Sequence, residues 1–338
     1  MDFMLPIILP RADKLISHQQ KIMSVGSCFT EHIGTALQDV KFDVLQNPSG
    51  ILFDPASVCG SLISYIRSEQ YNEQDLFYLN EVWHSWRHHS RFSGIDRYEV
   101  LKNMNASQHA AHYFLKEAKW LIVTLGSSFS YRLLHTESNK EITQAAFKEQ
   151  RVANCHRAPA QWFQKDMLTI AETISLLDNA LHQLFRFNAN LNIIFTISPV
   201  RHIRDGVVEN NRSKARLLEA VHHLVNKFDK LYYFPAYELV IDVLRDYRFY
   251  DIDLVHPNYA ATQFVLEHFL KTHTSDATQQ LIAEIKKITT AHKHNASFPS
   301  TAAHQRFLKI NLEKTTALQQ QHPYLNLRNE LDYFSNGE

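Results

Sequence analysis

The sequence predicts an α/β fold, with a parallel sheet that helices cover on both faces. Short apolar runs recur along the chain, and segments with helical spacing separate them. Most of these runs end at glycine, proline or small polar residues, as buried strands do before a turn. Because a helix between two strands returns the chain to the same edge of a sheet, strands that alternate with helices favour parallel pairing.

The first strand–turn–helix unit, at residues 21–34, is the one around which the other units are organised. Its apolar run breaks at Gly26-Ser27 and resumes with helix-compatible residues. Ser27 would then lie at the carboxyl end of a strand, which is where α/β proteins bind ligands. The hydroxyl could attack an acyl carbon while the helix N-terminus helps to hold the oxyanion. Alternatively, Ser27 is only a helix N-cap.

The remaining elements of the α/β part follow in chain order. Residues 1–20 are expected to form an extended arm, and residues 71–95 an irregular insert or lid, while residues 127–160 show no clear pattern. Further strands are expected at residues 42–46, 120–125, 192–197 and 230–234. Helices are expected at residues 55–70, 96–118, 162–187, 211–228, 237–245 and 259–272.

The end of the chain differs from the rest. Residues 273–338 contain no strand-like run and are typical of helices joined by polar turns. We therefore expect an α/β domain at residues 1–272 and a C-terminal helical extension at residues 273–338. The chain has 338 residues, of which 45% are hydrophobic, so it can form one large domain or two modest ones.

The charge and cysteine content of the sequence restrict the binding partners and the cellular compartment that we expect. The 35 lysines and arginines balance 35 acidic residues, so no global basic field draws the chain to nucleic acid. No uninterrupted apolar run approaches the length of a membrane span. The three cysteines, Cys28, Cys59 and Cys155, do not form a disulfide framework and favour a reducing compartment. We expect a soluble cytoplasmic protein.

Polar residues stand at the end of each expected strand, and a parallel sheet would bring them to one edge. The loop after the last strand adds Asp253-Leu254-Val255-His256, directly before a helix. In such a loop the histidine can accept the proton of a serine, while the aspartate fixes the histidine tautomer and stabilises the imidazolium. A helix-capping role for the aspartate is the simpler alternative.

Several motifs in one order resemble the GSCFA-domain family, a branch of the SGNH (GDSL-like) hydrolases. Gly26-Ser27-Cys28-Phe29 matches the signature that names the family, and the resemblance extends over residues 20–272. The other matching runs are NPSGIL at residues 47–52, TLG at 124–126, VANCH at 152–156, SPVRH at 198–202 and LRDYRFY at 244–250, which leads into 253–257.

The resemblance implies a flavodoxin-like three-layer α/β/α fold with a Ser/Asp/His site. Ser27 matches the nucleophile of the first family block, and Asp253 and His256 match the last block. Gly50 matches the second-block glycine, whose amide joins that of Ser27 in the oxyanion hole.

The third family block differs in this chain. The family usually has an asparagine soon after the glycine of this block, whereas Gly126 is followed by two serines. Asn154 or Asn47 could supply the missing oxyanion donor. Asn47 and Gly126 also count among the expected substrate-binding residues.

Arg201 and His202 follow another strand end and could bind an anionic or polar group of the substrate. For Arg201 the alternative is an ion pair with an internal carboxylate, such as Asp246 or Asp253, because arginine serves both purposes often.

The cysteines are expected to pack rather than to react. Cys28 could be a thiol nucleophile, but its side chain should point away from its neighbour Ser27, so a small buried hydrophobe is the better interpretation. Adjacent residues seldom face each other, so Cys155-His156 is interpreted as loop packing instead of a hydrolase pair or half a metal site.

The histidines do not indicate a metal site, because carboxylates and cysteines are missing at ligand spacing. They are instead expected on the surface, and the nearby Trp83 and Trp86 are expected to pack under a loop rather than to line a sugar groove. The histidines considered are His84, His88 and His89, and the pair His109 and His112.

The predicted function is that of an SGNH-type serine esterase or acylhydrolase acting on a small-molecule or carbohydrate ester. An O-acetyl sugar is the substrate that the resemblance suggests. Neither a metal nor a cofactor is expected. Two alternatives remain: an O-acyltransferase with the same triad, and a non-catalytic binding module on an SGNH scaffold. The motifs of α/β-hydrolases, P-loop enzymes and dinucleotide binders are absent from the sequence.

Overall fold

The computed structural model describes residues 5–136, 139, 150–294 and 297–337. Its centre is a sheet of five parallel strands in the order β10-β9-β5-β1-β2. Counted along the chain, these five strands have the order 2-1-3-4-5, which is the flavodoxin-like order. The predicted α/β fold is thus confirmed. The strands are β1 (Ile22–Gly26), β2 (Val44–Gln46), β5 (Trp120–Leu125), β9 (Asn192–Ile197) and β10 (Leu231–Tyr233).

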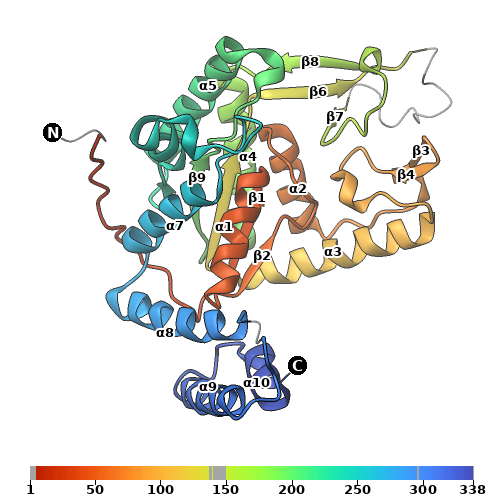
Figure 1. The fold of residues 1–338 in the computed structure, drawn as a ribbon. Coiled ribbons are helices and arrows are strands. Elements are labelled where there is room, and N and C mark those ends of the chain that lie inside the picture. The colour runs from red at the N-terminus through yellow and green to blue at the C-terminus, as the bar shows by residue number, and fades with distance from the viewer. Residues whose placement is uncertain (1–4, 137–138, 140–149, 295–296, 338) are drawn as a thin grey trace.

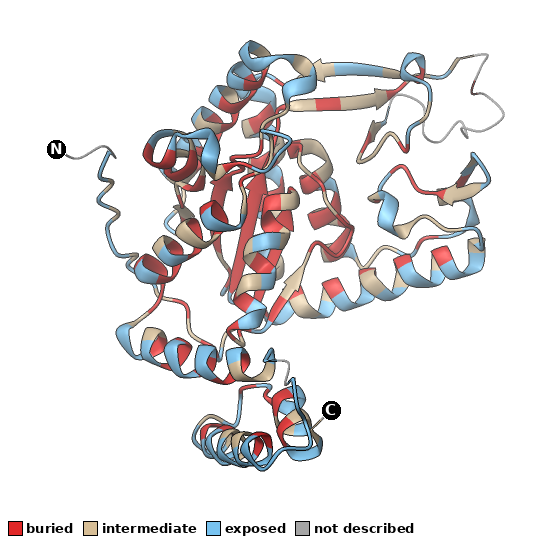
Figure 2. Ribbon diagram, in the orientation of Figure 1, coloured by how far each residue is buried: buried red, intermediate tan, exposed pale blue. Residues whose placement is uncertain are grey.

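Helices cover both faces of this sheet, and Figure 2 shows the strands buried between them. Alternate side chains of each strand enter different cores: Leu121 and Val123 pack on one face, whereas Trp120 and Ile122 pack on the other. The first face is covered by α2 (Pro55–Arg67), α3 (Arg97–Glu117), α4 (Ile170–Phe187) and α5 (Val207–Val225), and the second by α1 (Cys28–Asp39), α6 (Ala236–Glu238), the π-helical segment Leu239–Leu244 and α7 (Tyr259–His273).

Antiparallel strands project from one side of the α/β body (Figure 1). One hairpin lies in the insert at residues 71–95, where Trp86 is buried and stacks on Phe77 with 3.6 Å between ring centroids. The expected packing of Trp86 is thereby confirmed. The strands are β3 (Phe77–Leu79), β4 (Val82–His84), β6 (Phe129–Leu133), β7 (Arg151–Val152) and β8 (Phe163–Met167).

The predicted helix at residues 162–187 is wrong over its first part. Phe163–Met167 forms β8, which pairs with β6, and α4 begins only at Ile170. The start is fixed by Thr169 and Glu172, whose side chains each accept the backbone amide of the other in a capping box. Part of the unassigned stretch at residues 127–160 lies outside the described residues. Short 3₁₀ helices occupy Glu73–Asp75, Ser90–Phe92, Ala160–Trp162, Ile203–Asp205 and Tyr247–Phe249.

The chain ends in helices, as predicted, and they lie below the sheet in Figure 1. They are α8 (Asp276–His292), α9 (Ala302–Gln321) and α10 (Arg328–Asn336), and they share a small core of their own. An ion pair of 2.6 Å between Lys41 and the buried Glu330 joins α10 to the turn before β2. No helix in the described part of the chain is long and apolar enough to cross a membrane.

Candidate active site

The turn after β1 places Ser27 at the carboxyl edge of the sheet. Gly26 has φ +141°, and a Cβ there would lie 2.1 Å from the carbonyl oxygen of Thr124, so only glycine fits. Ser27 occupies the N-cap position of α1, yet its side chain makes no capping hydrogen bond. Its Oγ is buried and has no hydrogen-bond partner in the described structure. The hydroxyl is therefore not used as a cap.

Asp253 and His256 form a hydrogen-bonded pair in the loop before α7. Asp253 Oδ2 lies 2.6 Å from His256 Nδ1, and Asp253 Oδ1 accepts the amides of Val255 (2.9 Å) and His256 (3.0 Å). These bonds, the one from the His256 ring foremost, lower the pKa of Asp253 to about 2. The carboxylate thus holds the ring with Nε2 free to face a reactant. Both side chains are partly open to solvent, that of His256 at 41%.

The structure brings His202 next to Ser27. A Cβ at Gly126 would lie 3.4 Å from both Ser27 Cβ and His202 Nε2, so these two atoms are at most about 6.8 Å apart (3.4 Å + 3.4 Å). His202 Nε2 is buried and has no hydrogen-bond partner among the described residues. Burial lowers the pKa of His202 to about 4, so the ring is neutral near pH 7. No hydrogen bond joins the hydroxyl of Ser27 to His256 in this structure.

The amides expected in the oxyanion hole already have acceptors. The Ser27 amide donates to Thr124 O at 3.1 Å, and the Gly50 amide donates to Asn47 O at 2.8 Å. Asn154 lies in the segment after β7, where its Oδ1 accepts the amide of His156. An oxyanion at Ser27 would have to share or replace the two backbone bonds.

Asn47, directly after the neighbouring strand β2, supports the turn at Gly26-Ser27. Its Oδ1 accepts the Gly26 amide at 2.9 Å, and its Nδ2 donates to Glu31 at 3.3 Å. Arg91 bonds both Glu31 and the carbonyl oxygen of Asn47. With Asn47 1% exposed, these contacts fix the position of Gly26 and hence of Ser27.

Arg201 stacks on aromatic rings in place of an ion pair. Its guanidinium carbon lies 4.8 Å from the ring centre of Tyr247 and 4.5 Å from that of Tyr250, and Nη1 donates to Tyr247 Oη. Its backbone amide donates to Val255 O, which ties the segment after β9 to the Asp253 loop. In the described structure Asp246 pairs with Arg248 instead.

Lys214 is a buried residue of this region that sequence reasoning missed. It projects from α5 and is 1% exposed, and its Nζ donates to Gly126 O (2.5 Å) and Ser198 O (2.6 Å). It thus joins the ends of β5 and β9 beneath the site. One sequence signal could have revealed it: the lysine stands beside Ser213 and Leu217 on the buried face of the helix. A buried lysine needs hydrogen-bond acceptors in fixed positions.

The remaining candidates are cysteines and the histidines of the insert at residues 71–95. Burial raises the pKa of the Cys28 thiol, and burial likewise raises that of Cys155 to about 12, so both stay protonated. His84 and His88 are buried, so their expected surface position is wrong. Within the described residues, no group of three or more histidines, cysteines or acidic residues could hold a metal ion.

Comparison with known proteins identifies two matching family models. The model described as the GSCFA family matches residues 21–269, and the one described as GSCFA domain protein, C-terminal domain, matches residues 285–337. No curated protein matches the chain.

Two solved structures are also similar to the chain. A Clostridium thermocellum family 3 carbohydrate esterase is 10% identical, with 78% of this chain and 98% of that chain covered and a TM-score of 0.33. An acetyl xylan esterase, Est2A, from the rumen bacterium Butyrivibrio proteoclasticus is 12% identical, with 76% and 64% covered and a TM-score of 0.36.

Proposed function

The chain belongs to the GSCFA family, and from this premise we propose that it is an SGNH-type serine esterase. The observation that supports the proposal is the hydrogen-bonded Asp253–His256 pair, together with the buried hydroxyl of Ser27, which has no hydrogen-bond partner among the described residues. Ser27 Oγ attacks the ester carbonyl and gives its proton to His256 Nε2. His256 then protonates the leaving alkoxide, and water releases the acyl group from Ser27 by the same proton transfers in reverse order.

Catalysis requires that His256 approach Ser27 more closely than it does in this structure. The ring is partly exposed and lies on a loop in which Leu254 has φ +57°. Catalytic hydrogen bonds are often long or incomplete without substrate and form only in the complex. The proposal therefore includes a shift of the loop at residues 251–257 when the ester binds.

His202 supplies a donor where the family's asparagine is missing. The ring is neutral near pH 7, and in its Nε2–H tautomer it can donate to an oxyanion on the acyl carbon at Ser27. The amides of Ser27 and Gly50 contribute when they exchange Thr124 O and Asn47 O for the oxyanion. Replacing His202 by alanine is expected to lower kcat about 10²- to 10³-fold. An unchanged kcat in a folded His202→Ala protein would remove this donor from the proposal.

The proposed substrate is an acetyl ester of a carbohydrate or of another small alcohol, as the family resemblance suggests. Glycine is required at position 126 beside the proposed nucleophile, because a Cβ there would lie 2.8 Å from Phe53 Cβ and 3.4 Å from Ser27 Cβ and His202 Nε2. Transfer of the acyl group to a sugar hydroxyl would use the same acyl-enzyme.

Turnover of p-nitrophenyl acetate tests the proposed esterase. Ser27→Ala and His256→Ala are expected to reduce turnover to background with an unchanged circular dichroism spectrum, because each removes a group that takes part in bond making. Ser300→Ala and His109→Ala change exposed residues of the same types and are expected to keep full activity. Equal turnover in Ser27→Ala and wild type would refute the assignment of the nucleophile.

A non-catalytic binding module is the second candidate. The backbone acceptors already bound to the Ser27 and Gly50 amides favour it, because a preorganised oxyanion hole keeps its donors free. A folded wild-type protein that turns over no activated ester, and that binds an acetylated sugar equally well with and without the Ser27 hydroxyl, would establish this alternative.

A further inference from the structure

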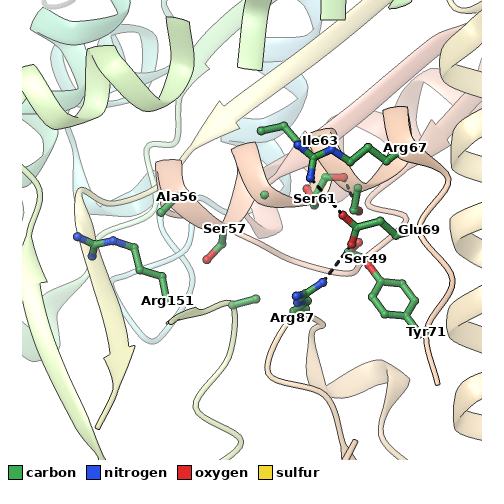
Figure 3. A pocket seen from close by; sticks show the side chains of 13 residues that line it. Ser49, Ala56, Ser57, Ser61, Ile63, Arg67, Glu69, Tyr71, Arg87 and Arg151 are labelled. Carbon is green, nitrogen blue, oxygen red and sulfur yellow. Dashed lines mark hydrogen bonds and ion pairs between the residues drawn. The ribbon is translucent and has the colours of Figure 1, made fainter. Parts of the chain in front are cut away.

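A cavity of about 250 Å³ opens between α2, the insert at residues 71–95 and the segment around β7. Figure 3 shows the residues that line it: Ser57 and Ser61 come from α2, with Arg151 at one end and Arg67 and Arg87 toward the other. About eight molecules of liquid water occupy such a volume, at about 30 Å³ each, so a small molecule fits. None of the residues proposed for ester cleavage lines it.

The lining carries excess positive charge. Arg67, Arg87 and Arg151 contribute three guanidinium groups, and Glu69 is the one carboxylate among the lining residues. Glu69 lies 3.0 Å from Arg87 and 3.9 Å from Arg67, so it balances part of the charge at that end only. The other end, with Arg151, has no carboxylate in the lining.

Arg151 has donor capacity that the described part of the chain does not use. Its Nη1 is buried and has no hydrogen-bond partner there. A buried, unpaired guanidinium donor is costly, and a carboxylate or phosphate oxygen would satisfy it with a charge-assisted hydrogen bond.

The floor of the cavity offers acceptors to hydroxyl groups. Ser61 Oγ donates to Val58 O at 2.8 Å and Ser64 Oγ donates to Ser61 O at 2.7 Å, so the protons of these hydroxyls are used inside α2. A serine oxygen has two lone pairs, so the interactions of Ser61 with Tyr65 and of Ser64 with Tyr71 leave one lone pair on each oxygen for a ligand hydroxyl. Next to Ser61 in α2, Gly60 leaves open space, because a Cβ there would have no heavy atom within 4 Å.

From this combination we propose that the cavity is a second ligand site, which binds a small hydroxylated anion such as a sugar phosphate or a sugar carboxylate. The anionic group bonds Arg151, and the hydroxyl groups donate to the serines of α2. The site is separate from Ser27, which does not line the cavity, although one segment borders both: Ser49 lines the cavity, and the Leu52 amide donates to Gly26 O at the turn before Ser27.

Isothermal titration of the full-length protein tests this site, with glucose 6-phosphate and glucuronate as hydroxylated anions. Glucose and inorganic phosphate report the sugar and the anion separately, and all titrations are made at matched ionic strength. Saturable binding of at least one hydroxylated anion is expected, tighter than that of glucose or phosphate. Arg151→Gln is expected to weaken it about tenfold or more.

Two further variants keep the result decisive. Gly60→Leu fills the cavity without a change of charge and is expected to abolish binding, whereas Arg328→Gln, on the exposed side of α10, is expected to leave the Kd unchanged. The proposal is overturned if neither hydroxylated anion binds, or if Gly60→Leu and Arg151→Gln bind as wild type does. Because titration does not depend on ester cleavage, failure here is distinct from failure of the proposed esterase.

Discussion

Lys214 makes the stability of the protein depend on pH in a way that one substitution can isolate. Burial lowers the pKa of Lys214 from 10.5 to about 7. In that range the unfolded chain binds a proton that the folded chain does not, so stability rises as the pH rises. The free-energy cost of burying the Lys214 amine is at its maximum below pH 7 and disappears above pH 10.5. The two pKa values correspond to about 3–4 kcal/mol of stability gained between pH 7 and pH 10.

Lys214→Met removes this titration and also the donor to Gly126 O and Ser198 O. In the variant, the two buried carbonyls lose their hydrogen-bond partner, which destabilises the folded state by about 1–3 kcal/mol each. Near pH 7 this loss is offset, because the variant has no amine to desolvate on folding. Urea unfolding of both proteins at pH 7 and pH 10 gives the free energies of unfolding. The advantage of wild type over Lys214→Met in the free energy of unfolding is expected to be about 3–4 kcal/mol larger at pH 10 than at pH 7. An advantage that is equal at both pH values would refute the reasoning.

Three further substitutions test separate contacts. Asp253→Asn is expected to lower kcat for p-nitrophenyl acetate about 10³- to 10⁴-fold with little change in stability, because His256 loses its acceptor; a loss below tenfold would contradict the triad. Gly50→Ala is expected to destabilise the protein by about 2 kcal/mol or more in thermal unfolding, because φ is +83° and the new Cβ would lie 2.2 Å from His89 Cβ; an unchanged melting temperature would speak against this backbone. Lys41→Met leaves the buried Glu330 with His292 alone, 3.8 Å away and charged only when protonated, so α10 is expected to become sensitive to limited proteolysis at a cost of about 3–5 kcal/mol; equal cleavage rates would show that the Lys41 pair does not hold α10.

The sheet could be predicted from the sequence because its strands are buried on both faces. Runs such as Trp120–Leu125 are buried along their whole length, are apolar except for Thr124 and are followed by a glycine, which distinguishes them from helices. The strand Phe163–Met167 was assigned to a helix because it is short, half-exposed and lies directly before a real one. Its conformation depends on pairing with β6, and that contact has no local signal.

The candidate site can be predicted from the sequence only where the interacting residues belong to one short motif. The Asp253-x-x-His256 spacing gives a hydrogen-bonded pair inside one loop, so a short stretch of sequence contains the whole geometry. The position of His202 beside Ser27 depends instead on how the segment after β9 packs against Gly126. The acceptors of the Ser27 and Gly50 amides depend equally on neighbouring segments.

Covalent labelling tests the central claim, that Ser27 is an activated nucleophile, most directly. The wild-type protein is treated with a fluorophosphonate, digested and analysed by mass spectrometry, with Ser27→Ala and His256→Ala treated in parallel. We predict one adduct on the peptide that contains Ser27, strongly reduced labelling in His256→Ala and none in Ser27→Ala. Labelling that persists in Ser27→Ala, or a folded wild-type protein that remains unlabelled, would contradict the account.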